Sequence, residues 1–250
     1  MTMDNKIKNI SILRYTPELD DKPHFESYEV PFSHETSVLD ALNYIRDNID
    51  PSLSYRSSCR MAVCGSCAIM VNRVPKLACK TFIREYDKCH VLMLEPLENF
   101  PIERDLVTDI SDMIAKLESV EPYIHPQKDA PSNQAGIQTP RELEKYRQFA
   151  QCTHCGCCYA ACPQYKLHPD FIGPAALTLL YRYNHDSRDK DNRIRKAIMG
   201  QDKAVWRCTS VGYCSDVCPK CVDPASAIQI EKEESAFDYV KHFFKKLKRS

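Results

Sequence analysis

The sequence carries no excess of charge of either sign. Its 34 lysines and arginines balance 34 aspartates and glutamates, so the formal net charge at pH 7 is zero. Proteins that bind nucleic acid concentrate positive charge to neutralise phosphates. We therefore expect no nucleic-acid partner. The absence of a basic recognition helix likewise counts against a DNA-binding regulator.

Long apolar runs are also missing. No stretch approaches the roughly 18 apolar residues that a membrane-spanning helix requires. Residues 1–6 contain no apolar signal core. These absences predict a protein that is cytoplasmic and soluble by itself. Glycine is scarce as well, with six residues, and they form no dinucleotide-binding pattern.

Cysteine, in contrast, is abundant, with 14 residues in the chain. Most of them fall into three ordered runs. The runs are Cys59-x4-Cys64-x2-Cys67-x11-Cys79, Cys152-x2-Cys155-x2-Cys158-x3-Cys162-Pro163 and Cys208-x5-Cys214-x3-Cys218-Pro219. Disulfides seldom persist in a reducing cytosol, where closely spaced cysteines usually bind metal. Zinc sites favour two separated pairs, so a zinc-stabilised scaffold is the alternative to a multi-iron cluster.

The first run has the spacing of a plant-type two-iron ferredoxin. We expect its thiolates to hold a [2Fe-2S] cluster. The predicted ligands are Cys59, Cys64, Cys67 and Cys79. Gly65 would let the backbone approach closely, so that N–H groups can point at the sulfurs. Such hydrogen bonds raise the reduction potential of a cluster.

The second run, with its terminal Cys-Pro, matches the bacterial ferredoxin pattern. In that pattern the fourth cysteine ligates the other of two clusters. Cys162 is therefore assigned to the neighbouring site, and by the same internal symmetry Cys218 reaches back. The predicted ligands of a [4Fe-4S] cluster are Cys152, Cys155, Cys158 and Cys218.

The third run lacks one ligand. A complete motif beginning at Cys208 would have its second cysteine at position 211, where the chain has Val211. Valine cannot bind iron, so Cys162, Cys208 and Cys214 remain. A cube without one corner ligand can lose that iron, which predicts a [3Fe-4S] cluster. The alternative is a four-iron cluster with water or substrate on the open iron. Three cysteines are expected to be unligated and partly buried, namely Cys89, Cys157 and Cys221.

Residues 1–105 are predicted to be rich in β-structure. Apolar alternation predicts strands and helical spacing predicts one helix. The strands are expected at 7–15, 25–32, 68–72 and 89–94, and the helix at 36–45. This order suggests a small mixed sheet packed on one helix.

Residues 106–250 are predicted to be helical. Prolines and small polar residues mark a linker-like crossing at about 123–140. Helices are expected to begin at Thr139-Pro140, Gly173-Pro174 and Asp223-Pro224, the last one running to about Phe244. The fold class is therefore α+β, with one domain at 1–105 and a second at 106–250, as the length also suggests.

A two-iron domain followed by a helical domain with four-iron and three-iron sites resembles one family. It is the family of iron–sulfur subunits of succinate dehydrogenase and fumarate reductase. The resemblance covers almost the whole chain, and the segments that carry it are 55–67, 75–79, 171–174 and 217–220. It implies a plant-type ferredoxin (β-grasp) domain followed by an all-α bacterial-ferredoxin-like domain.

Within that family the chain resembles bacterial menaquinol:fumarate reductases more than ubiquinone-linked succinate dehydrogenases. The latter usually have a Trp pair soon after the Cys-Pro of the second run, whereas this chain has no Trp at 164–169. They also tend to have His after the first cysteine of the third run, where this chain has Thr209. Residues 99–107 and 208–214 agree with the fumarate reductase form.

The resemblance implies an electron-transfer subunit of an oxidoreductase, active in anaerobic respiration. Electrons would pass from menaquinol through the three clusters to the covalent FAD of a partner flavoprotein, which reduces fumarate to succinate. Membrane anchor subunits would hold the chain at the cytoplasmic face of the inner membrane. A succinate dehydrogenase that reduces quinone is the close alternative, and an iron–sulfur redox sensor is a distant one.

Two residues near the third cluster match the quinone pocket of the family. They are Gln229 and Lys232, which lie three apart on one helix face. The alternative is a pair of exposed polar residues. The basic tail at 241–249 contains interleaved apolar residues. It could contact anionic lipid or the anchor subunits, and a solvated tail is an equal alternative.

Overall fold

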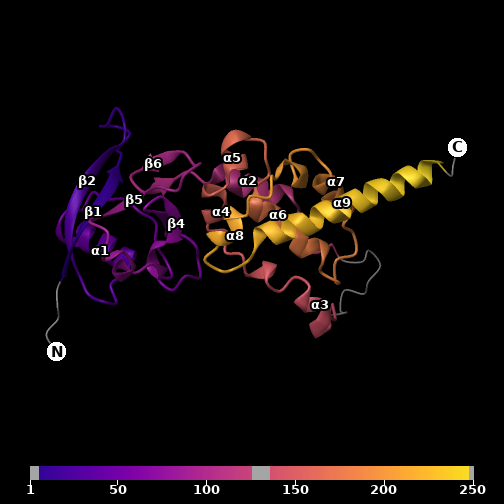
Figure 1. The fold of residues 1–250 in the computed structure, drawn as a ribbon, viewed down its shortest axis with the longest axis horizontal. Coiled ribbons are helices and arrows are strands. Elements are labelled where there is room, and N and C mark those ends of the chain that lie inside the picture. Colours follow the sequence, from indigo (N-terminus) through magenta and orange to yellow (C-terminus); the bar gives the residue numbers. More distant parts are fainter. Residues whose placement is uncertain (1–5, 126–135, 248–250) are drawn as a thin grey trace. The chain divides into compact units, whose positions relative to one another are not determined.

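The structure is a computed structural model that describes residues 6–125 and 136–247, with side chains described as far as residue 239. The chain divides into two compact units (Figure 1). The first is Met1–Ile110 with Thr153–Ala161, and the second is Ser111–Cys152 with Cys162–Ser250. The predicted crossing at 123–140 lies partly outside the described residues. The side chains of the tail at 241–249 lie wholly outside them.

A five-stranded mixed sheet forms the body of the first unit (Figure 1). Its strands, in the order β2-β1-β5-β3-β4, include all four of those predicted, at 7–15, 25–32, 68–72 and 89–94. The bounds are β1 (Lys6–Arg14), β2 (His24–Phe32), β3 (Ala68–Val71), β4 (Val74–Leu77) and β5 (Val91–Glu95). β1 pairs antiparallel with β2 and parallel with β5. β3 pairs antiparallel with both β4 and β5.

The sheet packs on helix α1 (Val38–Asn48) through the alternation that β1 shows in sequence. Ile10 and Ile12 are fully buried, while Ser11 between them is only half-buried. α1 begins where Ser37 and Asp40 form a capping box. The Ser37 side chain accepts the Asp40 N–H at 3.1 Å, and the Asp40 carboxylate accepts the Ser37 N–H at 2.9 Å. The predicted sheet on one helix is thus confirmed.

Helix α6 (Pro174–Asn184) lies at the centre of the second unit. All of its residues from Pro174 to Tyr181 are buried, and it packs against the long helix α9 (Pro224–Leu247), drawn in yellow in Figure 1. The other helices of this unit are α2 (Ser111–Ser119), α3 (Pro140–Glu144), α5 (Pro163–Leu167), α7 (Arg193–Met199) and α8 (Tyr213–Asp216). Proline opens α3, α6 and α9, as predicted.

None of the helices in the described residues combines the length and the apolar character needed to cross a bilayer. Several elements of the first unit were not predicted. They include β4, the hairpin of β6 (Ile102–Arg104) and β7 (Val107–Thr108), and the short helix α4 (Cys157–Ala160) inside the second cysteine run.

Candidate iron–sulfur centres

The first cysteine run forms a loop that turns its backbone N–H groups toward sulfur. Arg60 and Ala62 adopt left-handed φ angles of 58° and 57°, and these turns curl the loop. The N–H groups of residues 61, 63 and 64 donate to Cys59 Sγ at 3.3 to 3.4 Å. Several amides directed at one sulfur are the arrangement expected for a cluster thiolate.

Backbone hydrogen bonds to sulfur link the four cysteines of this run in two pairs. Cys59 N–H donates to Cys64 Sγ at 3.5 Å, and Cys79 N–H donates to Cys67 Sγ at 3.5 Å. Ala62 N–H donates to Cys79 Sγ at 3.3 Å. The structure therefore brings together the four cysteines predicted for the two-iron cluster, although Cys79 is distant in sequence.

Hydrogen bonding and burial act in opposite directions on these thiols. The Ser66 hydroxyl donates to Cys64 Sγ at 3.3 Å and is the main cause that lowers the pKa of Cys64 to about 6. Burial raises the pKa of Cys67 to about 12. A ligand thiol must be deprotonated, and a bound iron supplies the positive charge that a buried thiolate needs. The donor set of this loop thus fits a metal cluster.

No three His, Cys, Asp or Glu side chains in the described part of the chain converge closely enough to hold a single metal ion. An iron–sulfur cluster does not require such convergence. Its protein thiolates are shared among several irons, so each iron takes only one or two of them.

Gly65 lies in the tightest part of the first loop. Its φ is +77°, and a methyl group there would lie 2.8 Å from Cys155 Cβ and 2.9 Å from the carbonyl oxygen of Thr153. Both of those residues belong to the same unit as Gly65. Any side chain at this position would therefore combine backbone strain with a collision. Gly65 was expected to let the backbone approach the sulfurs of the first run, and the structure shows in addition that it lies against the second cysteine run.

The second and third cysteine runs have the same backbone conformation. His154 and Ser210 both adopt a left-handed φ, of 52° and 58°. Gly156 and Gly212 follow with φ/ψ of 82°/−9° and 88°/−12°. Each glycine carbonyl then accepts the N–H three residues later, at 3.0 Å and 2.9 Å respectively. A short helix begins after each glycine, α4 in the second run and α8 in the third.

This match places Val211 at the position that Cys155 occupies in the second run. Both residues stand directly before the left-handed glycine. The Val211 side chain is 48% exposed, so it does not fill an apolar core. The spacing of the cysteines predicted that Val211 replaces a ligand cysteine. The backbone agrees, because Val211 and Cys155 occupy equivalent positions in the two loops.

The cysteines predicted for the four-iron cluster are found in both units. Cys152 and Cys218 in the second unit pack against one apolar cluster, which consists of Phe149, Tyr181, Val222 and Ala227. Val222 N–H donates to Cys218 Sγ at 3.3 Å. In the first unit Cys158 is buried. A hydrogen bond with Cys157 is the main cause that lowers the pKa of Cys155 to about 7.

The cysteines predicted for the three-iron cluster lie together in the second unit. Burial, together with the neighbouring thiols of Cys208 and Cys162, raises the pKa of Cys214 to about 12. Like charges this close cannot all ionise without a cation, so bound iron would stabilise this donor set. Ser210 N–H donates to Cys208 Sγ at 3.4 Å.

Of the three remaining cysteines, Cys157 is buried while Cys89 and Cys221 are exposed. The expectation of partial burial is therefore wrong for the last two. Cys221 has a left-handed φ of 54° in the turn that precedes α9, and Cys89 lies in the turn before β5. Turn residues of this kind project into solvent.

The two candidate quinone residues have different surroundings. Lys232 Nζ donates to the carbonyl oxygen of Cys208 at 2.7 Å and to Ser210 Oγ at 3.2 Å. Lys232, on α9, thus contacts the third cysteine loop directly. Gln229 is exposed, and its amide donates to Glu233 Oε1 at 3.3 Å along the same helix.

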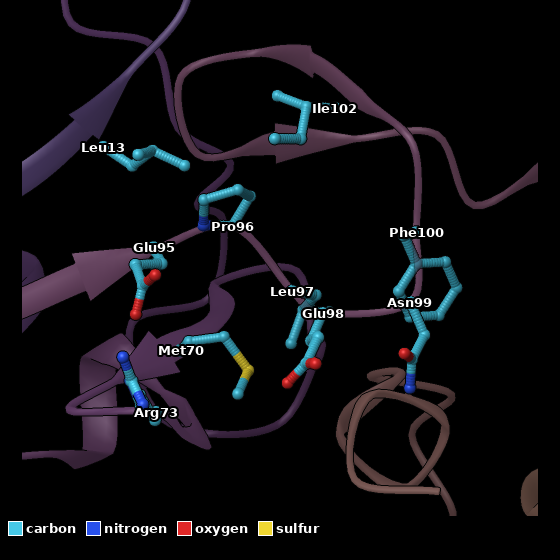
Figure 2. Close-up of a pocket in the computed structure, with 10 residues that line it drawn as sticks. All are labelled: Leu13, Met70, Arg73, Glu95, Pro96, Leu97, Glu98, Asn99, Phe100 and Ile102. Carbon is cyan, nitrogen blue, oxygen red and sulfur yellow. The ribbon is translucent and has the colours of Figure 1, made fainter. Parts of the chain in front are cut away.

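A surface pocket of about 470 Å³ lies elsewhere in the first unit (Figure 2). Its lining includes Met70, Arg73 and Phe100 but no cysteine. Asn99 stands at its edge and directs its amide away from it, donating to the carbonyl oxygens of Tyr159 and Ala160 at 3.0 and 2.9 Å (Figure 2). The pocket therefore borders Asn99, which contacts α4, but no cysteine lines it.

Sequence profiles agree with the two kinds of cysteine run. The 2Fe-2S iron-sulfur cluster binding domain matches residues 9–115, and the 4Fe-4S dicluster domain matches residues 144–219. The fumarate reductase iron-sulfur subunit of Haemophilus influenzae is 54% identical over 249 residues, which cover 95% of this chain and 96% of that protein. The chain belongs to the fumarate reductase and succinate dehydrogenase iron–sulfur subunit family.

A succinate dehydrogenase subunit and a solved structure are also similar to the chain, at lower identity. The succinate dehydrogenase iron-sulfur subunit of Coxiella burnetii is 37% identical over 222 residues, covering 88% of this chain and 93% of that protein. Among solved structures, a chain of the Mycobacterium smegmatis Sdh1 complex in the apo form shares the fold. Its TM-score is 0.86 at 23% identity, covering 94% of this chain and 97% of that one.

Family membership makes the chain an iron–sulfur, electron-transfer component of an oxidoreductase complex. The α+β fold and the order of a two-iron domain before a four-iron domain are confirmed. The predicted [2Fe-2S] and [4Fe-4S] cofactors are supported by the two profiles.

Proposed function

We propose that this chain is the electron-transfer subunit of a membrane-bound menaquinol:fumarate reductase. It would carry electrons from menaquinol to the FAD of a flavoprotein subunit that reduces fumarate to succinate. Hydrophobic anchor subunits would hold it at the cytoplasmic face of the inner membrane. Higher identity to a fumarate reductase subunit than to a succinate dehydrogenase subunit supports this direction. The chain's own role is to hold clusters and set their potentials.

The proposed ligands follow the three cysteine groups, with one domain at 1–105 and the other at 106–250. When bound, such clusters accept and release single electrons. The [2Fe-2S] cluster would be held by Cys59, Cys64, Cys67 and Cys79. The [4Fe-4S] cluster would be held by Cys152, Cys155, Cys158 and Cys218. The [3Fe-4S] cluster would be held by Cys162, Cys208 and Cys214.

The observation that carries this proposal is the shared backbone of the second and third runs. Gly156 and Gly212 have nearly equal dihedral angles, so Cys155 and Val211 are equivalent positions. A loop that keeps the cluster-binding conformation but replaces one thiol by an aliphatic group supplies three ligands instead of four. This favours a three-iron cluster in the third run.

The quinone end of the proposal rests on Lys232. Its ammonium group has three N–H donors, and two of them reach Cys208 O and Ser210 Oγ. One donor then remains to polarise a quinone carbonyl close to the third cysteine loop. Gln229, one helical turn earlier on α9, would contribute a second polar group on that face.

Electron paramagnetic resonance (EPR) of the purified complex tests the ligand assignment. The Val211→Cys variant should lose the three-iron signal of the oxidised protein and gain a four-iron signal on reduction. Val74→Cys is a matched control, since Val74 is 43% exposed on β4 and far in sequence from the third run. A three-iron signal that persists in Val211→Cys would show that position 211 is not the missing ligand.

Quinone specificity tests the direction of the reaction. The intact complex should turn over menaquinol with fumarate faster than it reduces ubiquinone with succinate. A marked preference for ubiquinone would favour a succinate dehydrogenase instead. Both outcomes leave the cluster ligands unchanged, so this experiment is independent of the EPR test.

A further inference from the structure

Ser66 stands between two proposed ligands of the two-iron cluster and contacts one of them. Its hydroxyl oxygen lies 3.3 Å from Cys64 Sγ, which is within hydrogen-bond distance when sulfur is the acceptor. The Ser66 residue is exposed, so its side chain fills no core. The recorded contact of the Ser66 side chain is thus with the sulfur of Cys64, and not with a buried apolar core.

The Ser66 contact differs in kind from the other hydrogen bonds to sulfur in the first loop. Apart from contacts between the thiols themselves, the other donors to these four sulfurs in the described residues are backbone N–H groups, such as that of Cys59, 3.5 Å from Cys64 Sγ. A backbone donor persists when its side chain is replaced. Ser66 is thus the donor in this loop that evolution or mutagenesis can add or remove without moving the backbone.

The direction of the hydrogen bond is fixed by chemistry. A cluster thiolate has no proton and can only accept, so the Ser66 hydroxyl must donate. Reduction adds negative charge to the cluster and its sulfurs, and hydrogen bonds to a charged acceptor are roughly twice as strong as neutral ones. A donor at Cys64 Sγ therefore stabilises the reduced state more than the oxidised state and raises the reduction potential.

We propose that Ser66 is a positioning residue that raises the reduction potential of the two-iron cluster through Cys64. This inference rests on the proposed role of Cys64 as a ligand. The hydroxyl would make the cluster a better electron acceptor than the same loop with backbone donors alone. Apart from the cysteine thiols, which lose their protons when they bind a metal, no other side chain of residues 59–67 donates to a cysteine sulfur in the described structure.

The test is a redox titration of the two-iron EPR signal in the intact complex. Ser66→Ala should lower the midpoint potential so that the ratio of reduced to oxidised cluster at a fixed potential falls about tenfold, which equals about 59 mV for a one-electron couple. Ser66→Thr should titrate close to the original protein because it keeps the hydroxyl. Ser66→Val should match Ser66→Ala, since it has the shape of threonine without the donor.

Ser58→Ala is the matched control and should leave the potential unchanged. Ser58 is an exposed neighbour of Cys59 whose hydroxyl forms no recorded hydrogen bond in the described residues. Equal midpoint potentials for Ser66→Val and Ser66→Thr, with intact two-iron signals, would overturn the proposal for Ser66. The absence of any two-iron signal from the unsubstituted protein would instead overturn the assignment of Cys64 as a ligand.

Discussion

The second and third cysteine runs share a backbone and differ at one ligand position. Each passes through a left-handed residue, then a left-handed glycine, then a short helix that ends before Cys-Pro. Cys155 occupies the position before the glycine in one loop, and Val211 occupies it in the other. The conformation of the loop is therefore independent of that thiol.

The comparison shows that the residues that determine the conformation of the loop differ from the residue that determines the number of cluster ligands. Gly156 and Gly212 supply the dihedral angles that few other residues adopt, and the helices α4 and α8 fix the exit. The side chain at 155 or 211 has no part in those hydrogen bonds. One substitution can thus change the number of ligands without disturbing the fold that holds the other cysteines.

The two loops are also held by different side chains. Asn99 donates to the carbonyl oxygens at the end of α4, in the first unit. Lys232 donates to Cys208 O and Ser210 Oγ at the start of the third loop. A neutral amide supports the loop with four proposed ligands in its cluster, whereas a cation supports the loop with three.

The largest expected effect comes from making the second loop resemble the third. Cys155→Val removes one thiol from the proposed four-iron set and keeps the backbone, because valine already occupies the equivalent position at 211. We expect the four-iron signal of the reduced complex to disappear and a second three-iron signal to appear on oxidation. EPR of the oxidised and reduced complex measures both changes.

Cys221→Ala controls for the loss of a cysteine as such. Cys221 is exposed and lies outside the proposed ligand sets, so all three signals should persist. If Cys155→Val kept a normal four-iron signal, Cys155 would not be a ligand and the equivalence of positions 155 and 211 would have no chemical meaning.

The sequence sufficed for the elements with a clear period. Alternation on β1 and β2 and helical spacing on α1 predicted each element to within a few residues, and prolines marked the starts of α3, α6 and α9. β4 and the hairpin β6–β7 were missed because strands of two to four residues are too short to show alternation. β3 is equally short but was predicted, because its residues form a continuous apolar run. Pro75 lies within β4, which further masks its strand character.

For the candidate centres, the spacing of the cysteines in the sequence predicted which of them belong to one cluster. It could not predict which other side chains contact the sulfurs or the cysteine loops. The signal for Ser66 was present, since a hydroxyl residue stands between two predicted ligands. Its contact with Cys64 depends on the curl of the loop. The Lys232 contact with Cys208 joins residues 24 apart, and the packing of residues 153–161 with the first unit joins segments that no local pattern connects.

A smaller effect should follow from removing the cation that holds the third loop. Lys232→Met keeps an unbranched side chain that is one atom shorter, and it loses the hydrogen bonds to Cys208 O and Ser210 Oγ. The variant also loses the charged donor that we propose for the quinone carbonyl. A hydrogen bond from a charged group contributes about 1.5–3 kcal/mol, and each 1.4 kcal/mol corresponds to a factor of about ten. We expect quinol oxidation by the complex to fall by about tenfold or more, measured as menaquinol:fumarate turnover.

Because Lys232 contacts the third loop and Asn99 the second, we expect the loss of the Lys232 hydrogen bonds to affect the three-iron cluster alone. The three-iron signal of Lys232→Met should change in shape or midpoint potential, whereas the two-iron and four-iron signals should not. Lys22→Met, at an exposed position in the first unit, should leave turnover and all signals unchanged. Equal changes in every signal would mean that Lys232 supports the whole subunit and has no special relation to the third loop.

The smallest expected effect tests whether the two glycines are equivalent. Alanine in a left-handed conformation costs roughly 1–2 kcal/mol, so Gly156→Ala and Gly212→Ala should each lower the melting temperature by a few degrees, at about 2–4 °C per kcal/mol. A methyl group at Gly156 would also lie 3.2 Å from Leu97 Cδ1, whereas at Gly212 it would meet nothing within 4 Å. Gly156→Ala should therefore have a slightly lower melting temperature than Gly212→Ala, as measured by thermal loss of cluster absorption.

Gly200→Ala is the control, because φ is −74° there, and it should leave the melting temperature almost unchanged. A lower melting temperature for Gly212→Ala than for Gly156→Ala would contradict the shared design of the two loops.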